Sequence, residues 1–307
     1  MHRKRKGIVM KKQICLILSI LLCFCLYGCS VQPETPENPY RAVSYKSETI
    51  ENGVVTFVDL AEYDYDENGY QTKSREYRNG VLTQTNIYEN DAFGNILKVT
   101  SISDGKTTVF DHNLILDDDG RILLQEASSE GILLYTLEYT YDKSGNKTSE
   151  VYTHMEDGTP EVIRNMELTY DRNGQLIREI HHNQDGTYLL YDYEAGKQLK
   201  TESYDSSDEL LSYWEYTYNN RGQLVQESFY SCQRWGDSRT SKLTEYFLYT
   251  YDETGYVVTR TNHSTREKPV ETYSVTTYDE YGNKLLKELY MDNQLYWRIT
   301  QEFERIP

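Results

Sequence analysis

The chain has 307 residues, a formal net charge of -17 and 30 Tyr residues, which form most of its aromatic content. With 38 % hydrophobic residues and this much Tyr, it lacks the composition of a disordered protein and is expected to fold. Tyr is typical of β-strands. The balance of 49 acidic against 32 basic residues argues against a nucleic-acid partner, because affinity for phosphate backbones comes from clustered Lys and Arg.

The N-terminal segment has the pattern of an export signal. Six Lys and Arg residues and no acidic residue precede an apolar run from Ile14 to Tyr27. As a helix this run rises about 21 Å, which is too short for a hydrocarbon core of about 30 Å. We therefore predict a cleaved signal peptide over residues 1–28 rather than a membrane span, with Met1 or Met10 as the start.

The apolar run ends in Leu26-Tyr27-Gly28-Cys29, which resembles the lipobox of bacterial lipoproteins. The resemblance implies that Cys29 is linked to diacylglycerol and becomes the mature N-terminus, so that the protein is extracytoplasmic and anchored to the bacterial membrane. The alternative is a Cys-rich apolar segment in which Cys29 has no role. Removal of residues 1–28 would take six positive charges away and change the net charge from -17 to -23.

The next segment is expected to be a tether. Three of the six Pro residues of the chain, Pro33, Pro36 and Pro39, lie among polar residues, which is typical of an extended, solvated linker. We predict a Pro-rich tether over residues 29–44 and one repeat domain over residues 45–307. Cys232 lies in this domain, and without a supporting motif it is interpreted as a packing residue rather than a nucleophile.

An internal repeat organises the rest of the chain. Alignment on the motif Tyr-Asp-x-x-Gly gives nine windows, at spacings of 22 to 33 residues. The Gly residues of the nine windows are Gly69, Gly94, Gly120, Gly145, Gly174, Gly196, Gly222, Gly255 and Gly282. The other motif residues that we assign to repeat turns are Tyr65, Asp66, Tyr141, Asp142, Tyr170, Asp171, Tyr218, Tyr251, Asp252, Tyr278 and Asp279.

The motif has the chemistry of a hairpin turn. Asp at the first position of a type I turn accepts a backbone N–H with its side chain, and Gly at the fourth position adopts the positive φ that leads into a bulge. Between these turns lie further Gly residues, mostly in pairs such as Asn79-Gly80 and Asp157-Gly158. Each repeat is therefore predicted to contain two turns and two strands.

The segments between turns have a period of two. Leu137, Tyr139 and Tyr141 alternate with Glu138 and Thr140, as in a half-buried antiparallel strand. We predict an all-β fold of about eighteen strands, as a single elongated antiparallel sheet of repeated β-hairpins, twisted or spiral. Such a sheet has open edges, and three basic residues near the C-terminus are expected to discourage edge pairing. They are Lys284, Lys287 and Arg298.

The repeats resemble the YD repeats of the Rhs family of bacterial surface and secreted proteins. The segments that carry the resemblance are Tyr141-Asp-Lys-Ser-Gly-Asn146, Tyr170-Asp-Arg-Asn-Gly-Gln175, Tyr251-Asp-Glu-Thr-Gly255 and Tyr278-Asp-Glu-Tyr-Gly-Asn283. The resemblance covers residues 60–290 and implies strands that wind into a spiral sheet, at the cell surface. No toxin-like domain follows Gly282, so the enclosing shell known from that family is not expected here.

No cofactor and no metal site is predicted. The segment from Asp64 to Gly69 matches the opening of a calcium-binding EF-hand loop, but position twelve is Arg75 instead of Glu, and the segment is one copy of the repeat turn. His181 and His182 are adjacent, so on a strand their rings point to opposite faces and cannot share one metal.

The motifs favour a lipid-anchored, non-catalytic structural or binding module at the cell surface. In this hypothesis the Tyr rings pack across strands and direct their hydroxyl groups to water. A first alternative is a carbohydrate- or cell-wall-binding protein that uses exposed rings such as Trp214 and Tyr216. A second is a glycan-active enzyme, which needs a pair of convergent carboxylates. A glycan or a protein at the cell surface is thus the candidate ligand.

Overall fold

The computed structural model describes residues 40–235, 238–265 and 272–306, and the regular structure in these residues is twenty β-strands. Cys29 and the expected signal peptide lie outside the described residues. The strands are β1 (Tyr40–Glu51), β2 (Val54–Tyr65), β3 (Gln71–Arg78), β4 (Val81–Asn90), β5 (Ile96–Ser103), β6 (Lys106–Leu116), β7 (Ile122–Ser129), β8 (Ile132–Tyr141), β9 (Lys147–Glu156), β10 (Thr159–Tyr170), β11 (Leu176–His182), β12 (Tyr188–Glu194), β13 (Lys197–Tyr204), β14 (Leu210–Tyr218), β15 (Leu224–Trp235), β16 (Ser238–Tyr251), β17 (Val257–Ser264), β18 (Thr272–Tyr278), β19 (Lys284–Met291) and β20 (Gln294–Arg305).

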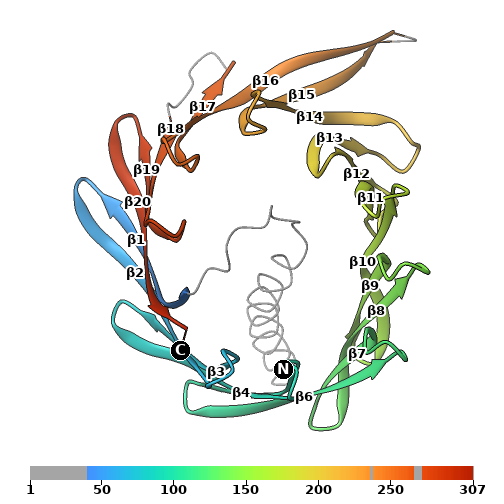
Figure 1. Cartoon of the computed structure of the whole chain (residues 1–307), viewed down its shortest axis with the longest axis vertical. Coiled ribbons are helices and arrows are strands. Elements are labelled where there is room, and N and C mark those ends of the chain that lie inside the picture. Colours follow the sequence, from blue (N-terminus) through green and yellow to red (C-terminus); the bar gives the residue numbers. More distant parts are fainter. Residues whose placement is uncertain (1–39, 236–237, 266–271, 307) are drawn as a thin grey trace, which may run out of the picture. The chain divides into compact units, whose positions relative to one another are not determined.

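The sheet is a closed antiparallel ring. Each strand pairs with the next one along the chain, and β20 pairs with β1 in a ladder from Tyr40 opposite Arg305 to Thr49 opposite Trp297. Figure 1 shows the strands following one another around the ring in chain order. The all-β prediction and the predicted antiparallel hairpins are confirmed, with twenty strands instead of about eighteen.

The prediction of an open, elongated sheet is wrong. A long meander of twisted, sheared strands curves until its two edges meet, and their pairing satisfies N–H and C=O groups that an open edge leaves exposed. The predicted end of the tether is also too late in the chain. Residues 40–44 belong to β1, because they continue its ladder with β20.

Side-chain contacts reinforce the seam between the first and last strands. The indole N–H of Trp297 donates a hydrogen bond to Ser47 Oγ at 2.7 Å. Near the other end of the same ladder, the guanidinium of Arg41 lies 2.8 Å from a carboxylate oxygen of Glu304. The contacts join residues about 250 positions apart in sequence, so closure is specified by side chains as well as by the backbone.

Arg298 takes part in the seam instead of discouraging edge pairing. Its guanidinium lies 2.9 Å from Glu288 on β19 and 3.7 Å from Glu48 on β1. Glu48 is buried and also lies 2.6 Å from the ammonium group of Lys46. The basic side chain that was expected to protect an edge thus bridges three consecutive strands.

The two faces of the sheet differ in burial. Register places Val99, Ala127 and Leu137 on one face, which we call the buried face, because most of the buried hydrophobic residues lie there. Ile87 and Ile102 are exposed on the opposite face, which we call the open face. Among the described residues no large side chain is fully buried, so stability depends on contacts between neighbouring strands, as in other repeat proteins.

The closed topology can be tested with a disulfide. Ser44 on β1 and Glu302 on β20 are directly opposite, at a Cα separation that suits a disulfide. In the full chain with all five native Cys residues replaced by Ser, the pair Ser44→Cys and Glu302→Cys is expected to form an intramolecular disulfide. Non-reducing electrophoresis would show a faster band that disappears with reductant.

The matched control combines Ser44→Cys with Glu138→Cys, a site on the distant strand β8. This control is expected to give no intramolecular band. An open sheet would leave both double variants without one, or cross-link them only as dimers.

Candidate functional site

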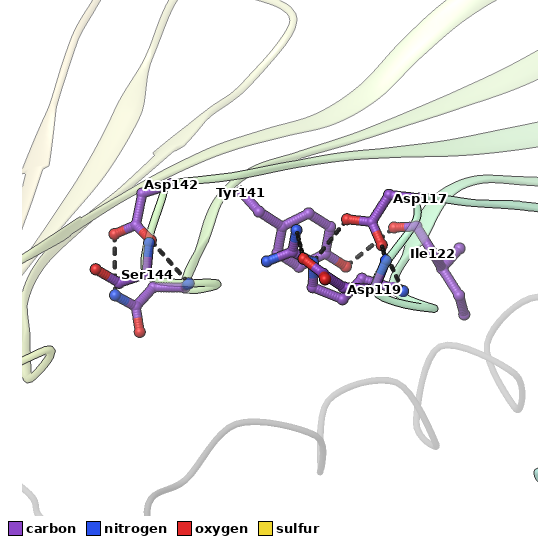
Figure 2. Close-up of polar contacts among 8 residues, drawn as sticks. Asp117, Asp119, Ile122, Tyr141, Asp142 and Ser144 are labelled. Carbon is purple, nitrogen blue, oxygen red and sulfur yellow. Dashed lines mark hydrogen bonds and ion pairs between the residues drawn. The ribbon is translucent and has the colours of Figure 1, made fainter.

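The repeated motif forms one well-defined turn, which we call the Asx turn. At Asp142 the carboxylate oxygen Oδ1 accepts the backbone N–H groups of Ser144 at 2.8 Å and Asn146 at 3.0 Å. The N–H of Gly145 donates to the carbonyl of Asp142 at 3.1 Å, and the side-chain amide of Asn146 donates to Oδ2 at 2.9 Å. Figure 2 shows these carboxylate contacts. A single Asp side chain therefore holds the whole turn.

The described residues contain nine Asx turns, in each of which the first side chain accepts a backbone N–H. They begin at Asp66, Asp91, Asp117, Asp142, Asp171, Asp205, Asn219, Asp252 and Asp279. The assignment of Gly196 to this set is wrong: Ala195 and Gly196 form a two-residue turn in which both residues have positive φ.

Two turns with the backbone bonds of the Asx turn follow odd-numbered strands. The predicted turn at Asp185-Gly186 begins at Asn183 and has these bonds, but the carboxylate of Asp185 accepts the N–H of Thr187. The turn at Asp205 was not predicted, because Asp208 replaces its Gly.

Eight of the Asx turns lie on one rim of the ring, which we call the Asx rim. Because strand direction alternates, the connections that follow even-numbered strands all lie at the same end, and these connections are the eight Asx turns and the Ala195-Gly196 turn. The strand β1 also begins at this end, at Tyr40. The Asx rim is thus a row of turns that follow one another in chain order.

At five of the Asx turns, the residue before the Asp or Asn joins its turn to the preceding part of the rim. The hydroxyl of Tyr141 donates to the backbone carbonyl of Ile122 at 3.0 Å, as Figure 2 shows. Equivalent bonds run from Tyr65 to Ala42 at 2.7 Å, from Tyr218 to Gln198 at 2.8 Å, from Tyr251 to Leu224, and from the amide of Asn90 to Gln71 at 2.9 Å. The expectation that these hydroxyl groups point to water is therefore wrong. We call this contact the turn-to-turn bond.

At three positions the residue after a Gly covers the Tyr ring of the next turn. The guanidinium of Arg121 lies 5.0 Å from the ring centroid of Tyr141, and Asp117 and Asp119 hold it at 2.6 and 2.8 Å. The other two contacts are Lys197 over Tyr218 at 5.6 Å and a stack of Tyr256 on Tyr278 at 4.8 Å. At the start of β1, Arg41 lies over Tyr65 at 4.4 Å in the same way. Cation–π contacts thus add to the turn-to-turn bonds of Tyr65, Tyr141 and Tyr218.

Glycine at the fourth turn position is favoured for two reasons, which Gly94 and Gly282 show together. Gly94 has a φ of +85°, which favours glycine, and a Cβ added there would lie 2.5 Å from the ring of Tyr70 in the preceding turn. Gly282 has a φ of +83° and meets the ring of Tyr256 in the same way. The motif Gly therefore permits both the turn and the close approach of its neighbour.

The electrostatics of the turns follow from these contacts. The side-chain amide of Asn146 and the backbone N–H groups of the turn lower the pKa of Asp142 below its ordinary value. Asn95 and backbone N–H groups lower the pKa of Asp91 in the same way. Burial raises the pKa of Tyr141, so this phenol keeps the proton that it donates.

The acidic residues of the segment that matches the start of an EF-hand form an ion pair and turn hydrogen bonds within their own hairpin. Asp64 lies 2.6 Å from the guanidinium of Arg75, and Asp66 Oδ1 accepts the N–H groups of Asn68 and Tyr70 at 3.0 and 2.8 Å. Across residues 40–235, 238–265 and 272–306, no cluster of three or more His, Cys, Asp or Glu side chains could hold a metal ion. The same residues include no helix that is long and apolar enough to cross a membrane.

The two adjacent His residues lie on opposite faces. His181 contacts Glu179 at 2.9 Å on the buried face, and His182 contacts Glu167 at 3.1 Å on the open face. Cys232, half-buried on β15, is a free thiol. None of these residues is brought together with another candidate.

The rings singled out as sugar platforms pack within the sheet. Trp214 contacts the rings of Phe229 and Phe247, at centroid distances of 4.9 and 5.9 Å. The hydroxyl of Tyr216 lies 3.1 Å from Thr201 Oγ1. All these residues are on the buried face, so their contacts account for the Trp and Tyr at these positions.

The sequence reasoning missed four aromatic pairs on the open face. Each pair stacks across two neighbouring strands, with centroids 4.7 or 4.8 Å apart and planes within 14°. The pairs are Tyr188 with Tyr204, Tyr213 with Tyr230, Tyr246 with His263, and Tyr273 with Tyr290. In the last three pairs the first ring lies six residues before the Asp or Asn that begins the Asx turn. The exception is Tyr188, whose hairpin has the Ala195-Gly196 turn. This spacing is present in the sequence, but the alignment on Tyr-Asp did not use it.

Two shallow grooves mark the rims. One, of about 460 Å³, lies between neighbouring Asx turns and is lined by residues that include Asn219, Arg221, Tyr249 and Asp252. The other, of about 540 Å³, lies at the seam on the opposite rim and is lined by residues that include Ile50, Val55, Leu295 and Arg298. In the first groove Asn219 and Asp252 bond to their own turns, and in the second Arg298 pairs with Glu48 across the seam.

Comparisons with known proteins show only distant structural likeness. No family model matches the chain, and no curated protein matches it. The TcdB2-TccC3 structure without its hypervariable C-terminal region is 14 % identical over 85 % of this chain and 18 % of its own, with a TM-score of 0.36. A porin-like protein from Bacteroides uniformis is 12 % identical over 89 % of this chain and 100 % of its own, also with a TM-score of 0.36. A protein of unknown function from Bacteroides fragilis covers 44 % of this chain at 14 % identity, with a TM-score of 0.22.

The chain spans less than a fifth of the length of the TcdB2-TccC3 chain. Likenesses at these TM-scores carry no functional conclusion. The function must therefore be argued from the residues themselves.

The turn-to-turn bond can be tested by removing one hydroxyl. Tyr141→Phe keeps the ring under Arg121 but leaves the carbonyl of Ile122 without its donor. We expect the free energy of unfolding to fall by about 1 kcal/mol, the usual net value of such a bond. Urea unfolding followed by circular dichroism measures the change. The control Tyr296→Phe, at an exposed ring, is expected to change it by less than about 0.5 kcal/mol.

The Asx turns predict loss of stability in acid. A carboxyl whose pKa is lowered by folding stabilises the protein above its unfolded pKa, and the contribution is lost as the pH falls through the folded pKa. Asp142→Asn keeps an oxygen acceptor, as Asn219 does in its own turn. We expect the decrease in unfolding free energy below about pH 4 to be shallower in this variant. An unchanged pH dependence would contradict the role of the charged form.

Proposed function

We propose that this chain is a lipid-anchored, extracytoplasmic repeat protein of the YD type that acts as a non-catalytic structural or binding module at the cell surface. The single observation that supports the proposal is the use of the motif residues. Asp closes each turn, Gly admits the neighbouring side chain, and Tyr bonds to the preceding turn. The side chains of the motif therefore serve to join one repeat to the next.

The buried face supports the same role. The aromatic residues Trp214 and Phe247 fill space between strands, and Arg260 lies 3.6 Å over the ring of Phe247. The guanidinium of Arg260 also donates to the hydroxyl of Tyr249 at 2.7 Å and lies 3.3 Å from Glu227. These charged and aromatic groups satisfy one another, which is the arrangement of a rigid scaffold.

The proposed lipid anchor rests on the lipobox-like segment Leu26-Tyr27-Gly28-Cys29. The place where the tether joins the ring bears on how far an anchored ring would lie from the membrane. The tether continues into β1 at Tyr40, at the Asx rim. Fewer than a dozen residues separate Cys29 from this point, so an extended tether spans at most about 40 Å. An anchored ring would therefore stay close to the membrane surface.

The anchor is tested by membrane partition. The wild-type chain expressed in a bacterium is expected to incorporate radiolabelled palmitate and to sediment with membranes. Cys29→Ala is expected to lose both the label and the sedimentation. Cys232→Ala is the matched control and is expected to keep both. A Cys29→Ala chain that stays membrane-bound would contradict the proposal.

A further inference from the structure

The four stacked aromatic pairs of the open face are confined to half of the ring. They lie on the hairpins β12/β13, β14/β15, β16/β17 and β18/β19, one pair on each. The five earlier hairpins have the same two directly opposite positions on the same face. These positions hold Leu60 and Tyr77, Thr85 and Ile102, Asp111 and Ser128, Thr136 and Thr153, and Asn165 and His182.

The fold itself does not require aromatic stacks at these positions. Hairpins with Thr136 opposite Thr153, or Asp111 opposite Ser128, close the same ladders and carry the same Asx turns. A structural need would apply equally to all the hairpins of a closed ring. The repetition of a stacked pair on four consecutive hairpins therefore indicates a role outside the scaffold.

The pairs form an oblique row. Tyr213 lies opposite Glu202, two residues from Tyr204, so each pair is displaced by two residues along the strand from the one before. Tyr246 lies opposite Ser228, two residues from Tyr230, which repeats the displacement. Neighbouring pairs are separated by two inter-strand spacings across the sheet and by two residues along the strand direction. This places them about 12 Å apart, so the whole row of four pairs extends about 35 Å.

The polar groups beside the rings are hydroxyls, carboxylates and the cations that pair with those carboxylates. The hydroxyl of Tyr204 donates to Glu202 at 3.0 Å, and that of Tyr290 donates to Glu288 at 2.9 Å. Lys200 lies 2.6 Å from Glu202 and 4.6 Å from the ring centroid of Tyr213, and Arg298 lies 2.9 Å from Glu288. Each ion pair is neutral as a whole, and hydroxyl groups can donate and accept hydrogen bonds. Such groups suit an uncharged ligand that is rich in hydroxyls.

We propose that the four aromatic pairs bind an uncharged, extended polysaccharide. The rings offer half-buried aromatic surface to the apolar edges of sugar rings, and the Tyr and Glu oxygens bond to sugar hydroxyls. A chain is required because a single sugar reaches one pair, whereas a chain contacts several and gains affinity from each. The inference deepens the binding role of the proposed surface module and does not depend on the lipid anchor.

The test compares two equivalent Tyr residues. Tyr290 belongs to a stacked pair, and Tyr77 occupies the same position in an earlier hairpin, opposite Leu60. Both hydroxyls bond to a glutamate, at 2.9 Å to Glu288 and 3.0 Å to Glu62. Replacement by Leu removes the same atoms from both places, so structural effects are matched.

The full chain, purified in detergent, is mixed with microcrystalline cellulose, chitin or insoluble mannan, and the unbound protein is measured after sedimentation. We expect the wild type to bind at least one of the three. Tyr290→Leu is expected to weaken that binding about tenfold, the effect of about 1.4 kcal/mol, and Tyr77→Leu to change it less than about twofold. Thermal unfolding of both variants verifies that they are folded.

Two results would overturn the inference: a wild type that binds none of the three polysaccharides, or equal losses in the two variants. Neither result bears on the anchor, which is read from palmitate labelling and membrane sedimentation. Conversely, a chain that is not lipidated but binds chitin in a Tyr290-dependent way would refute the anchor and support the binding surface.

Discussion

The hydrogen bond from one turn to the preceding turn is the interaction on which the rest of the ring depends. A sheet without a central core has little apolar burial to oppose the entropy of ordering its chain, so each strand must gain stability from its neighbours. The backbone ladders supply most of it, but ladders alone tolerate slippage. The bond from Tyr141 to the carbonyl of Ile122 fixes one turn against the next, and the same geometry recurs along the Asx rim.

This contact also explains why three residue types occur together in the motif. Asp142 organises its own turn, Tyr141 reaches back to the preceding one, and the glycine of the turn leaves space for the side chain that arrives from it. Where Tyr is replaced, another donor can take its place, as Asn90 does with the carbonyl of Gln71. The repeat is therefore better defined by its recurring hydrogen bonds than by the identity of its residues.

Local features of the fold could be predicted from the sequence, whereas features that depend on distant residues could not. Asp142 and Gly145 specify their turn within five residues, and alternation such as Leu137-Glu138-Tyr139 specifies a strand. Closure could not be predicted, because it depends on Arg298 meeting Glu48 across the whole chain. Gly196 was assigned to the wrong turn because its spacing fits the period, although Tyr193, three residues before it, lacks the side-chain carboxylate or amide that an Asx turn needs. The spacing of the aromatic rings from the turns is present in the sequence, but the strand register was needed to show which rings pair.

The antiparallel seam limits how many strands such a ring can have. Direction alternates from strand to strand, and β20 runs antiparallel to β1, so the number of strands must be even. With an odd number the first and last strands would be parallel, and their hydrogen-bond pattern would no longer match. The array therefore keeps this antiparallel seam only if it lengthens or shortens by whole hairpins, whereas a gain or loss of one strand would make the closing pair parallel. The hairpin is thus the unit in which this protein can change size and keep its seam.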